Sequence, residues 1–287
     1  VSVKRVGEVL DTLPSIVDPQ SPQQLPSGAT GKIEFKDVTF TYPDADLPVL
    51  SSINFTAEPG QTTAFIGSTG SGKSTLIDLI PRFYDVSAGQ ILLDGVDIRQ
   101  LKLEDLYDQI GYVPQKGVLF SGTIASNIKY GNAKASQKLV EKSAKIAQAA
   151  EFISELKNGY KNDIAQGGSN VSGGQRQRLS IARAIAVEPN VYIFDDSFSA
   201  LDFKTDAKLR SALAKETKHK TVLIVGQRIN TIMNADKIIV LDEGKIVGQG
   251  THQELMKGCQ VYQEIAASQL SEDDLQKMSA MTAKGAA

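Results

Sequence analysis

Residues 62–76 read TTAFIGSTGSGKSTL, a short apolar run followed by a glycine-rich turn. Apolar residues from Leu76 to Ile80 then recur with helical spacing. The segment from Gly67 to Ser74 fits the pattern G-x-x-x-x-G-K-[ST], with the strand before it and the helix after it that this pattern requires. Glycines let successive backbone N–H groups point at phosphate oxygens, and the start of a helix adds positive potential. The sequence therefore predicts a phosphate-binding loop.

This loop predicts a site for a nucleotide with Mg²⁺. Lys73 would reach the β- and γ-phosphates, and the Ser74 hydroxyl would face the metal. A glycine-rich turn with an accidental lysine is the alternative, expected in about one chain in a hundred of this length. The predicted nucleotide-binding residues of this segment are Gly67, Ser68, Thr69, Gly70, Ser71, Gly72, Lys73, Ser74 and Thr75.

A second acidic motif follows much later, where the apolar run VYIFD, residues 191–195, ends in Asp195. A carboxylate at the carboxyl end of a parallel strand faces the ligand crevice. It can hold magnesium, usually through water. A helix cap or turn aspartate is the alternative, but the phosphate loop favours the metal role. Cys259 is the only cysteine and there are two histidines, which argues against transition-metal chemistry.

The composition of the 287 residues is that of a globular protein, with 41% hydrophobic and 22% charged residues. The net charge of −2 argues against sequence-independent nucleic-acid binding, which needs a basic excess. No stretch approaches the ~20 apolar residues that cross a bilayer, and residues 1–10 do not resemble a signal peptide. Because the chain begins at Val1, we expect a fragment of a longer polypeptide.

Three regions are expected along the chain. Residues 1–31 begin with helical spacing up to residue 13 and continue as a proline-rich linker. Residues 32–268 form the compact domain, and residues 269–287 a polar, flexible tail. Strands are predicted at 33–42, 62–66, 191–195, 221–226 and 237–241, with further strand character at 91–93 and Ile98 around a turn at Asp94 and Gly95. Helices are predicted within 123–158 and at 172–187 and 204–217. This alternation predicts an α/β fold with a mostly parallel sheet.

Five elements in order make the sequence resemble the ATP-binding cassette (ABC) family. Besides the phosphate loop and the acidic strand end, they are Gln115 in VPQ, VSGGQ at 171–175 and SALD at 199–202. The resemblance implies a P-loop NTPase core, an antiparallel β-subdomain and a helical subdomain carrying the signature. It also implies that Gln115 contacts Mg²⁺ and takes part in catalysis, and that Tyr42 stacks on adenine. An ordinary strand tyrosine is the alternative for Tyr42.

The signature also has a physical interpretation. Ser172, Gly173 and Gly174 open a predicted helix, where N–H groups lack partners within the helix and attract anions. One chain cannot easily bring two helix starts to one γ-phosphate, whereas two chains packed head to tail can. In the family, each ATP lies between one phosphate loop and the other chain's signature, so Ser172, Gly173, Gly174 and Gln175 are predicted nucleotide contacts. A capped surface helix is the alternative.

Two segments resemble exporters in particular. The N-terminal helix and proline linker resemble the end of a transmembrane half, and GTIASNI at 122–128 resembles the segment where coupling helices of the membrane domain dock. The resemblance therefore implies a transmembrane domain in the same longer chain and a place on the cytoplasmic face of the cell membrane.

The chain departs from the family at two catalytic positions. The family has glutamate where this chain has Asp196, and histidine where it has Gln227. The missing methylene retracts the carboxylate by roughly 1.5 Å, and errors near ~1 Å can cost ~10²-fold in rate. A glutamine donates a hydrogen bond but carries no imidazolium charge. We therefore assign catalytic roles to Lys73, Gln115, Asp196 and Gln227, in a site that turns over slowly.

Paired losses of this kind resemble the degenerate half of a heterodimeric multidrug exporter, whose partner half-transporter carries the glutamate. A conventional homodimeric ATPase and a regulatory ATP-binding module remain alternatives. A DNA-repair ATPase would carry a coiled-coil insert between Gln115 and Ser172, and none is present. An importer subunit would begin near residue 32. QGG at 166–168 replaces the exporter segment GERG, so this segment receives no role.

Overall fold

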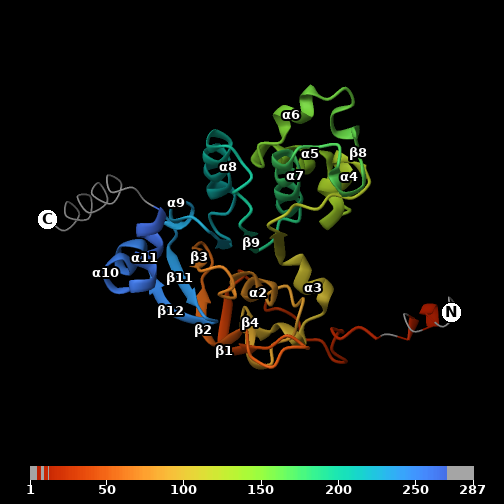
Figure 1. Cartoon of the computed structure of the whole chain (residues 1–287). Coiled ribbons are helices and arrows are strands. Elements are labelled where there is room, and N and C mark those ends of the chain that lie inside the picture. Colours follow the sequence, from red (N-terminus) through yellow and green to blue (C-terminus); the bar gives the residue numbers. More distant parts are fainter. Residues whose placement is uncertain (1–4, 8–9, 12, 270–287) are drawn as a thin grey trace.

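The chain folds into two lobes, shown in Figure 1. The structure is a computed structural model that describes residues 5–7, 10–11 and 13–269. The core lobe holds the large sheets with α2 (Lys73–Asp78), α3 (Leu103–Asp108), α10 (His252–Gly258) and α11 (Gln260–Gln269). The helical lobe holds α4 (Ile124–Ile128), α5 (Gln137–Ile146), α6 (Ala150–Glu155) and α7 (Gly173–Ala186).

A six-stranded sheet organises the core lobe, in the order β12-β11-β3-β10-β9-β6. The strands are β3 (Thr62–Gly67), β6 (Ile110–Val113), β9 (Val191–Asp195), β10 (Thr221–Val225), β11 (Lys237–Asp242) and β12 (Lys245–Gly250). All pairings are parallel except that of β11 with β12. Every residue of β9 is buried, as expected of a strand covered on both faces. The predicted, mostly parallel sheet is confirmed.

A second sheet is antiparallel, with the order β2-β1-β4-β5. Its strands are β1 (Ile33–Phe40), β2 (Leu50–Ala57), β4 (Ala88–Leu93) and β5 (Val96–Asp97). The antiparallel subdomain implied by the family resemblance is thus present. The predicted turn at Asp94 and Gly95 is present between β4 and β5, whereas Ile98 begins a 3₁₀ helix instead of continuing as a strand.

The helical segment predicted within 123–158 is divided into α4, α5 and α6. A 3₁₀ turn at Lys129–Gly131 follows α4, and α5 starts at its own cap, Ser136, whose side chain accepts from Leu139 N. α5 ends before Gln148, whose φ of 56° cannot continue a helix. The helical lobe is closed by a short antiparallel pair, β7 (Gly122–Thr123) with β8 (Asp163–Ile164).

Three apolar clusters hold the layers together. The first lies between the two large sheets and α2, and includes Phe35, Phe55 and Phe65. The second joins the helical lobe and α8 (Phe203–Glu216) to the other face of the parallel sheet, and includes Phe194. The third packs α9 (Ile229–Ile232), α10 and α11 against β3 and β11. The sheet edges that carry the predicted site are therefore fixed from several sides.

The segment before the compact domain runs along the core lobe without strands between residues 13 and 32. Gln23 N donates to Gln100 O at 2.7 Å, and the Asp18 carboxylate accepts from Leu103 N at 2.8 Å. Of the predicted N-terminal helix, residues 5–7 and 10 are helical. The tail predicted at 269–287 lies outside the described residues beyond Gln269. Within the described part of the chain, no helix combines the length and apolar character needed to cross a membrane.

Candidate functional site

The predicted phosphate loop joins β3 to α2, where the sequence placed it. Its shape depends on glycine. Gly72 caps α2 with φ of 97°, and a Cβ there would lie 2.7 Å from Leu50 Cδ2. A Cβ on Gly67 would lie 2.0 Å from Leu241 O, because β3 and β11 are neighbours. The loop therefore requires glycine at both positions.

The loop presents donors to solvent at its tip. Ser68, Thr69 and Gly70 are exposed, whereas Ser71 and Gly72 are buried. In the described part of the chain, the backbone N–H groups of Thr69 and Gly70 donate no hydrogen bond. Unpaired N–H groups on an exposed glycine loop at a helix start suit an anion such as a phosphate. The residues present thus fit the predicted ligand.

Lys73 folds back over this loop. Its Nζ donates to Gly67 O at 3.0 Å, to Ser68 O at 2.7 Å and to Ser71 Oγ at 3.3 Å. Burial lowers the pKa of Lys73, and the charges of Asp195 and Asp196 oppose this shift. The Lys73 ammonium group therefore lies against the loop, where the negative charges of Asp195 and Asp196 favour its protonated form.

Asp195 ends β9 beside the phosphate loop. Ser74 Oγ donates to Asp195 Oδ1 at 3.4 Å, so two of the three predicted metal residues face one another. Burial raises the pKa of Asp195 to about 6, against the lowering effect of the Ser74 hydrogen bond. The described residues contain no cluster of three metal-binding His, Cys, Asp or Glu side chains. Two oxygen ligands suit Mg²⁺ that completes its shell with waters and phosphate oxygens.

Asp196 occupies an unusual backbone conformation directly after the strand. Its φ is 43°, and its N–H donates to Val225 O at 3.0 Å. Gln115 Nε2 donates to Asp196 Oδ2 at 3.3 Å, which brings two predicted catalytic residues together. Burial raises the pKa of Asp196, while the hydrogen bonds from Gln115 and Ser199 lower it.

Gln227 lies on the loop between β10 and α9 and is exposed. The preceding Gly226 N donates to Phe65 O at 3.0 Å, which fixes the start of this loop on β3. The positive charge of the next residue, Arg228, lowers the pKa of Asp196. Val225, two residues before Gln227, accepts from Asp196 N, so the Gln227 loop begins next to the Asp196 backbone.

Tyr42 lies just beyond β1, not within it. Its hydroxyl is 2.9 Å from Thr75 Oγ1 on α2, and its ring packs edge-on against Phe40 and Tyr84 at 4.8 and 5.2 Å. The ring is partly exposed next to the helix that follows the phosphate loop. This position suits the predicted adenine contact.

The signature begins α7 in the helical lobe. Ser172 and Gln175 form a capping box: Ser172 Oγ accepts from Gln175 N at 3.2 Å, and Gln175 Oε1 accepts from Ser172 N at 2.9 Å. Gly173 is exposed, with open space where a Cβ would stand, and Gly174 approaches Ala200 of the SALD segment. Among the described residues, no hydrogen bond joins the signature to the phosphate loop.

Sequence reasoning missed Gln177, about one turn into the same helix. Its Nε2 donates to Pro114 O at 3.2 Å and its Oε1 accepts from Gly117 N at 3.1 Å, so it holds the backbone on both sides of Gln115. The side chain is 2% exposed. A polar residue at a buried helical position was the available sequence signal. The QGG segment forms a 3₁₀ turn before the signature, with φ of 67° at Gly167 and Gly168.

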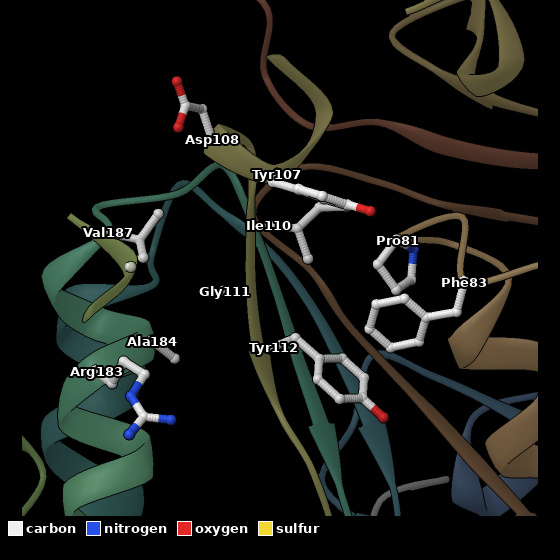
Figure 2. A pocket seen from close by; sticks show the side chains of 11 residues that line it. Pro81, Phe83, Tyr107, Asp108, Ile110, Gly111, Tyr112, Arg183, Ala184 and Val187 are labelled. Atoms are coloured by element: carbon white, nitrogen blue, oxygen red, sulfur yellow. The ribbon is translucent and has the colours of Figure 1, made fainter. Parts of the chain in front are cut away.

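A groove of about 270 Å³ lies between the lobes, shown in Figure 2. Arg183 and Ala184 of α7 form one wall, and Phe83 and Tyr112 lie on the other side. Phe83 is 47% exposed, which is high for a phenylalanine beside a pocket. Arg183 is fixed by hydrogen bonds to Asn127 O and Val118 O, both at 2.9 Å, so this wall is preorganised.

The fold and these motifs define an ATP-binding domain of the P-loop class. A family model described as ABC transporter matches residues 50–199, more than half of the chain. The chain belongs to the ABC transporter family, and the resemblance read from its motifs is confirmed.

Several relatives extend this finding. The chain is 48% identical over 272 residues to an "Uncharacterized ABC transporter ATP-binding protein" of Mycobacterium tuberculosis, covering 94% of this chain and 46% of the relative. It is 42% identical over 270 residues to an "ATP-dependent lipid A-core flippase" of Syntrophus aciditrophicus, covering 94% and 44%. It is 44% identical over 239 residues to a "Putative multidrug export ATP-binding/permease protein" of Staphylococcus aureus, covering 83% and 41%.

Among solved structures, a bacterial Atm1-family ABC exporter with ATP bound superimposes with a TM-score of 0.89 at 35% identity. The match covers 94% of this chain and 47% of that exporter chain. The chain therefore spans less than half the length of these relatives.

Proposed function

We propose that this chain is the cytosolic ATP-binding domain of an exporter, and that MgATP bound between two such domains drives export. The juxtaposition of Lys73 on its glycine loop with the Ser74–Asp195 pair at the end of β9 carries this proposal. The exporter names of the relatives and the likeness to a solved exporter support it.

Different residues of the chain have different roles at the nucleotide. Lys73 and the loop N–H groups bind the phosphates, and Tyr42 orients the base by stacking. Ser74, Asp195 and Gln115 would hold Mg²⁺, which when bound offsets the negative charge of the phosphates. Asp196 orients the attacking water, and Gln227 donates a hydrogen bond toward the γ-phosphate. Ser172, Gly173, Gly174 and Gln175 serve the nucleotide of the partner chain.

We propose that the nucleotide site formed by this chain's own phosphate loop hydrolyses ATP slowly. Asp196 is one methylene shorter than glutamate, and its carboxylate is engaged by Gln115 at 3.3 Å. A base must lie within hydrogen-bond reach of its water, and a retraction of roughly 1.5 Å lengthens the distance from the Asp196 carboxylate to that water. Gln227 supplies no imidazole. We therefore propose a heterodimer, in which the partner half-transporter carries the glutamate and receives this chain's signature, which stays near the family form LSGGQ except for Val171 at its first position.

The test is steady-state ATP hydrolysis by this chain at high concentration, beside Asp196→Glu, Gln227→His and the double variant. A fluorescent ATP analogue confirms binding, and the absence of tryptophan from the chain keeps the protein background low. Lys73→Ala in the double variant is the control that assigns turnover to this site. We expect a quiet unaltered chain and a gain of about 10- to 100-fold in the double variant.

Robust turnover by the unaltered chain would contradict the slow site and favour a homodimeric ATPase in which aspartate and glutamine suffice. Nucleotide binding without turnover in every variant would favour a regulatory ATP-binding module.

We further propose that the groove between the lobes receives a segment of the membrane half of the longer protein. We infer this occupant because the relatives are longer than this chain and one of them is named an "ATP-binding/permease" protein. The exposed side chains of Phe83 and Tyr107 would provide its apolar contacts. Phe83→Glu should lower ATP turnover of the membrane-reconstituted longer protein and leave nucleotide binding by this chain unchanged. Equal turnover of the two reconstituted proteins would contradict the assignment.

A further inference from the structure

Helix α9 begins at Ile229 without a cap from its own N-cap residue. That residue is Arg228, whose side chain has donors and no acceptor, and it makes no capping hydrogen bond. A helix start leaves backbone N–H groups without partners. Gln269, the last described residue of α11, supplies what is missing: its Oε1 accepts from Ile229 N at 2.9 Å.

The same amide group also reaches the other side of Arg228. Gln269 Nε2 donates to Gln227 O at 2.7 Å. One planar side-chain amide therefore binds the carbonyl before Arg228 and the N–H after it. These two bonds restrain the peptide planes that set the directions of the Gln227 and Arg228 side chains.

Both ends of this contact are anchored in one apolar cluster. Tyr262 and Ala266 bury α11 against β3 and β11, and Ile229 and Ile232 of α9 enter the same cluster. A hollow of about 200 Å³ lies beside the contact, lined by Arg228, Ile229, Asn230 and Gln269. The Gln269 amide thus holds the loop through two hydrogen bonds at the edge of this hollow.

We propose that Gln269 is a positioning residue for ATP turnover, which holds the Gln227–Arg228 loop so that its side chains face the nucleotide. The inference rests on the proposed function. It predicts that the loss of the bond to Gln227 O slows turnover even when the start of α9 stays capped.

Two substitutions separate positioning from capping. Gln269→Leu removes both hydrogen bonds. Gln269→Glu keeps an acceptor for Ile229 N but, when ionised, has no donor for Gln227 O. A carboxylate at a helix start is favourable, so a purely structural cap predicts that Gln269→Glu behaves like the unaltered chain. Gln263→Leu is the matched control, because Gln263 also lies on α11 and donates to a distant carbonyl, Met256 O, at 2.8 Å.

The series is measured in the Asp196→Glu/Gln227→His background, which retains the carbonyl of residue 227. Both Gln269 variants should lower turnover at saturating ATP by about three- to ten-fold, the effect of about one hydrogen bond, with KM within about twofold. Hydrogen exchange of the Ile229 amide should quicken in Gln269→Leu and stay slow in Gln269→Glu. If the background binds nucleotide without turnover, the release rate of the fluorescent analogue is compared instead, with the same ranking expected.

Full activity in Gln269→Glu would overturn the proposal and leave only a helix cap. An equal loss in Gln263→Leu would also overturn it, since the effect would then belong to α11 as a whole. Failure of the unaltered chain to bind any ATP analogue would instead overturn the proposed function and, with it, this inference.

Discussion

The Tyr112 hydroxyl donates to Asp78 Oδ1 at 2.8 Å and joins the strand before Gln115 to the helix after the phosphate loop. Tyr112 also packs edge-on against Phe83 at 5.6 Å and lines the groove between the lobes (Figure 2). One side chain thus contacts the groove with its ring and the nucleotide-binding helix with its hydroxyl.

This pair makes stability depend on pH. Burial raises the pKa of Asp78 above its usual value of 3.8, although the Tyr112 hydrogen bond opposes the shift. The folded chain therefore holds the proton more tightly than the unfolded chain. The Asp78 contribution to stability is present below pH 3.8 and is lost as the pH rises through the folded-state pKa. Asp78→Asn keeps an oxygen for Tyr112 and should remove this loss.

The measurement is urea denaturation of the nucleotide-free chain from pH 4 to pH 7. Asp105→Asn, which changes an exposed aspartate of α3, should keep the pH slope of the unaltered chain. Parallel slopes in the unaltered chain and Asp78→Asn would contradict the assignment.

The Gln177 bridge should be costly to remove. Gln177→Leu leaves Gly117 N and Pro114 O without this partner in a buried position, and we expect a loss of about 2–3 kcal/mol in the free energy of unfolding. Hydrogen exchange at Gly117 should quicken as well. Gln148→Leu is the comparison, because Gln148 is only partly buried and donates to carbonyls of its own turn at 3.3 Å. A loss no larger than that of Gln148→Leu would show that the bridge is not needed.

The phosphate loop should not tolerate a side chain at Gly72. Gly72→Ala combines a φ of 97° with a Cβ 2.7 Å from Leu50 Cδ2, and strain of this kind costs about 1–3 kcal/mol. Thermal unfolding should shift downward accordingly. Gly258→Ala, where a Cβ meets open space at the end of α10, should unfold close to the unaltered temperature. If both variants unfold together, the constraint at Gly72 is absent.

Lys73→Ala should weaken the binding of a fluorescent ATP analogue by about 100-fold, since hydrogen bonds to charged groups contribute about 1.5–3 kcal/mol each. Lys142→Ala removes a lysine that pairs with Glu216 at 2.6 Å on the surface and should leave binding unchanged. Comparable affinities of the two variants would contradict the phosphate role of Lys73.

Local pattern was enough to predict the site-bearing elements. β3, β9, β10 and β11 are short apolar runs, and α7 and α8 have long helical spacing, so the predicted ranges agree with the structure within a few residues. β2, β6 and β12 were missed. β6 has only four residues, and its identity as a strand comes from parallel pairing with β9, which periodicity cannot reveal.

The candidate site likewise contains residues that local pattern predicts and residues that only the fold reveals. The motif residues follow from spacing, because each lies at a strand end or a helix start. Gln177 and Gln269 act through contacts with residues 60 and 40 positions away, and no motif marks them. A glutamine on a helix usually faces solvent, so the roles of Gln177 and Gln269 become visible only when the fold brings a backbone N–H group opposite each side chain.

The capping box at Ser172 and the Gln177 bridge lie on one helix, α7. Ser172 and Gln177 are five residue steps apart, about 7.5 Å along the axis, and a helix of that length moves as a rigid rod. A tilt of α7 therefore moves the signature start together with the backbone on both sides of Gln115. One continuous helix therefore links the signature to the backbone beside Gln115 without any intervening loop.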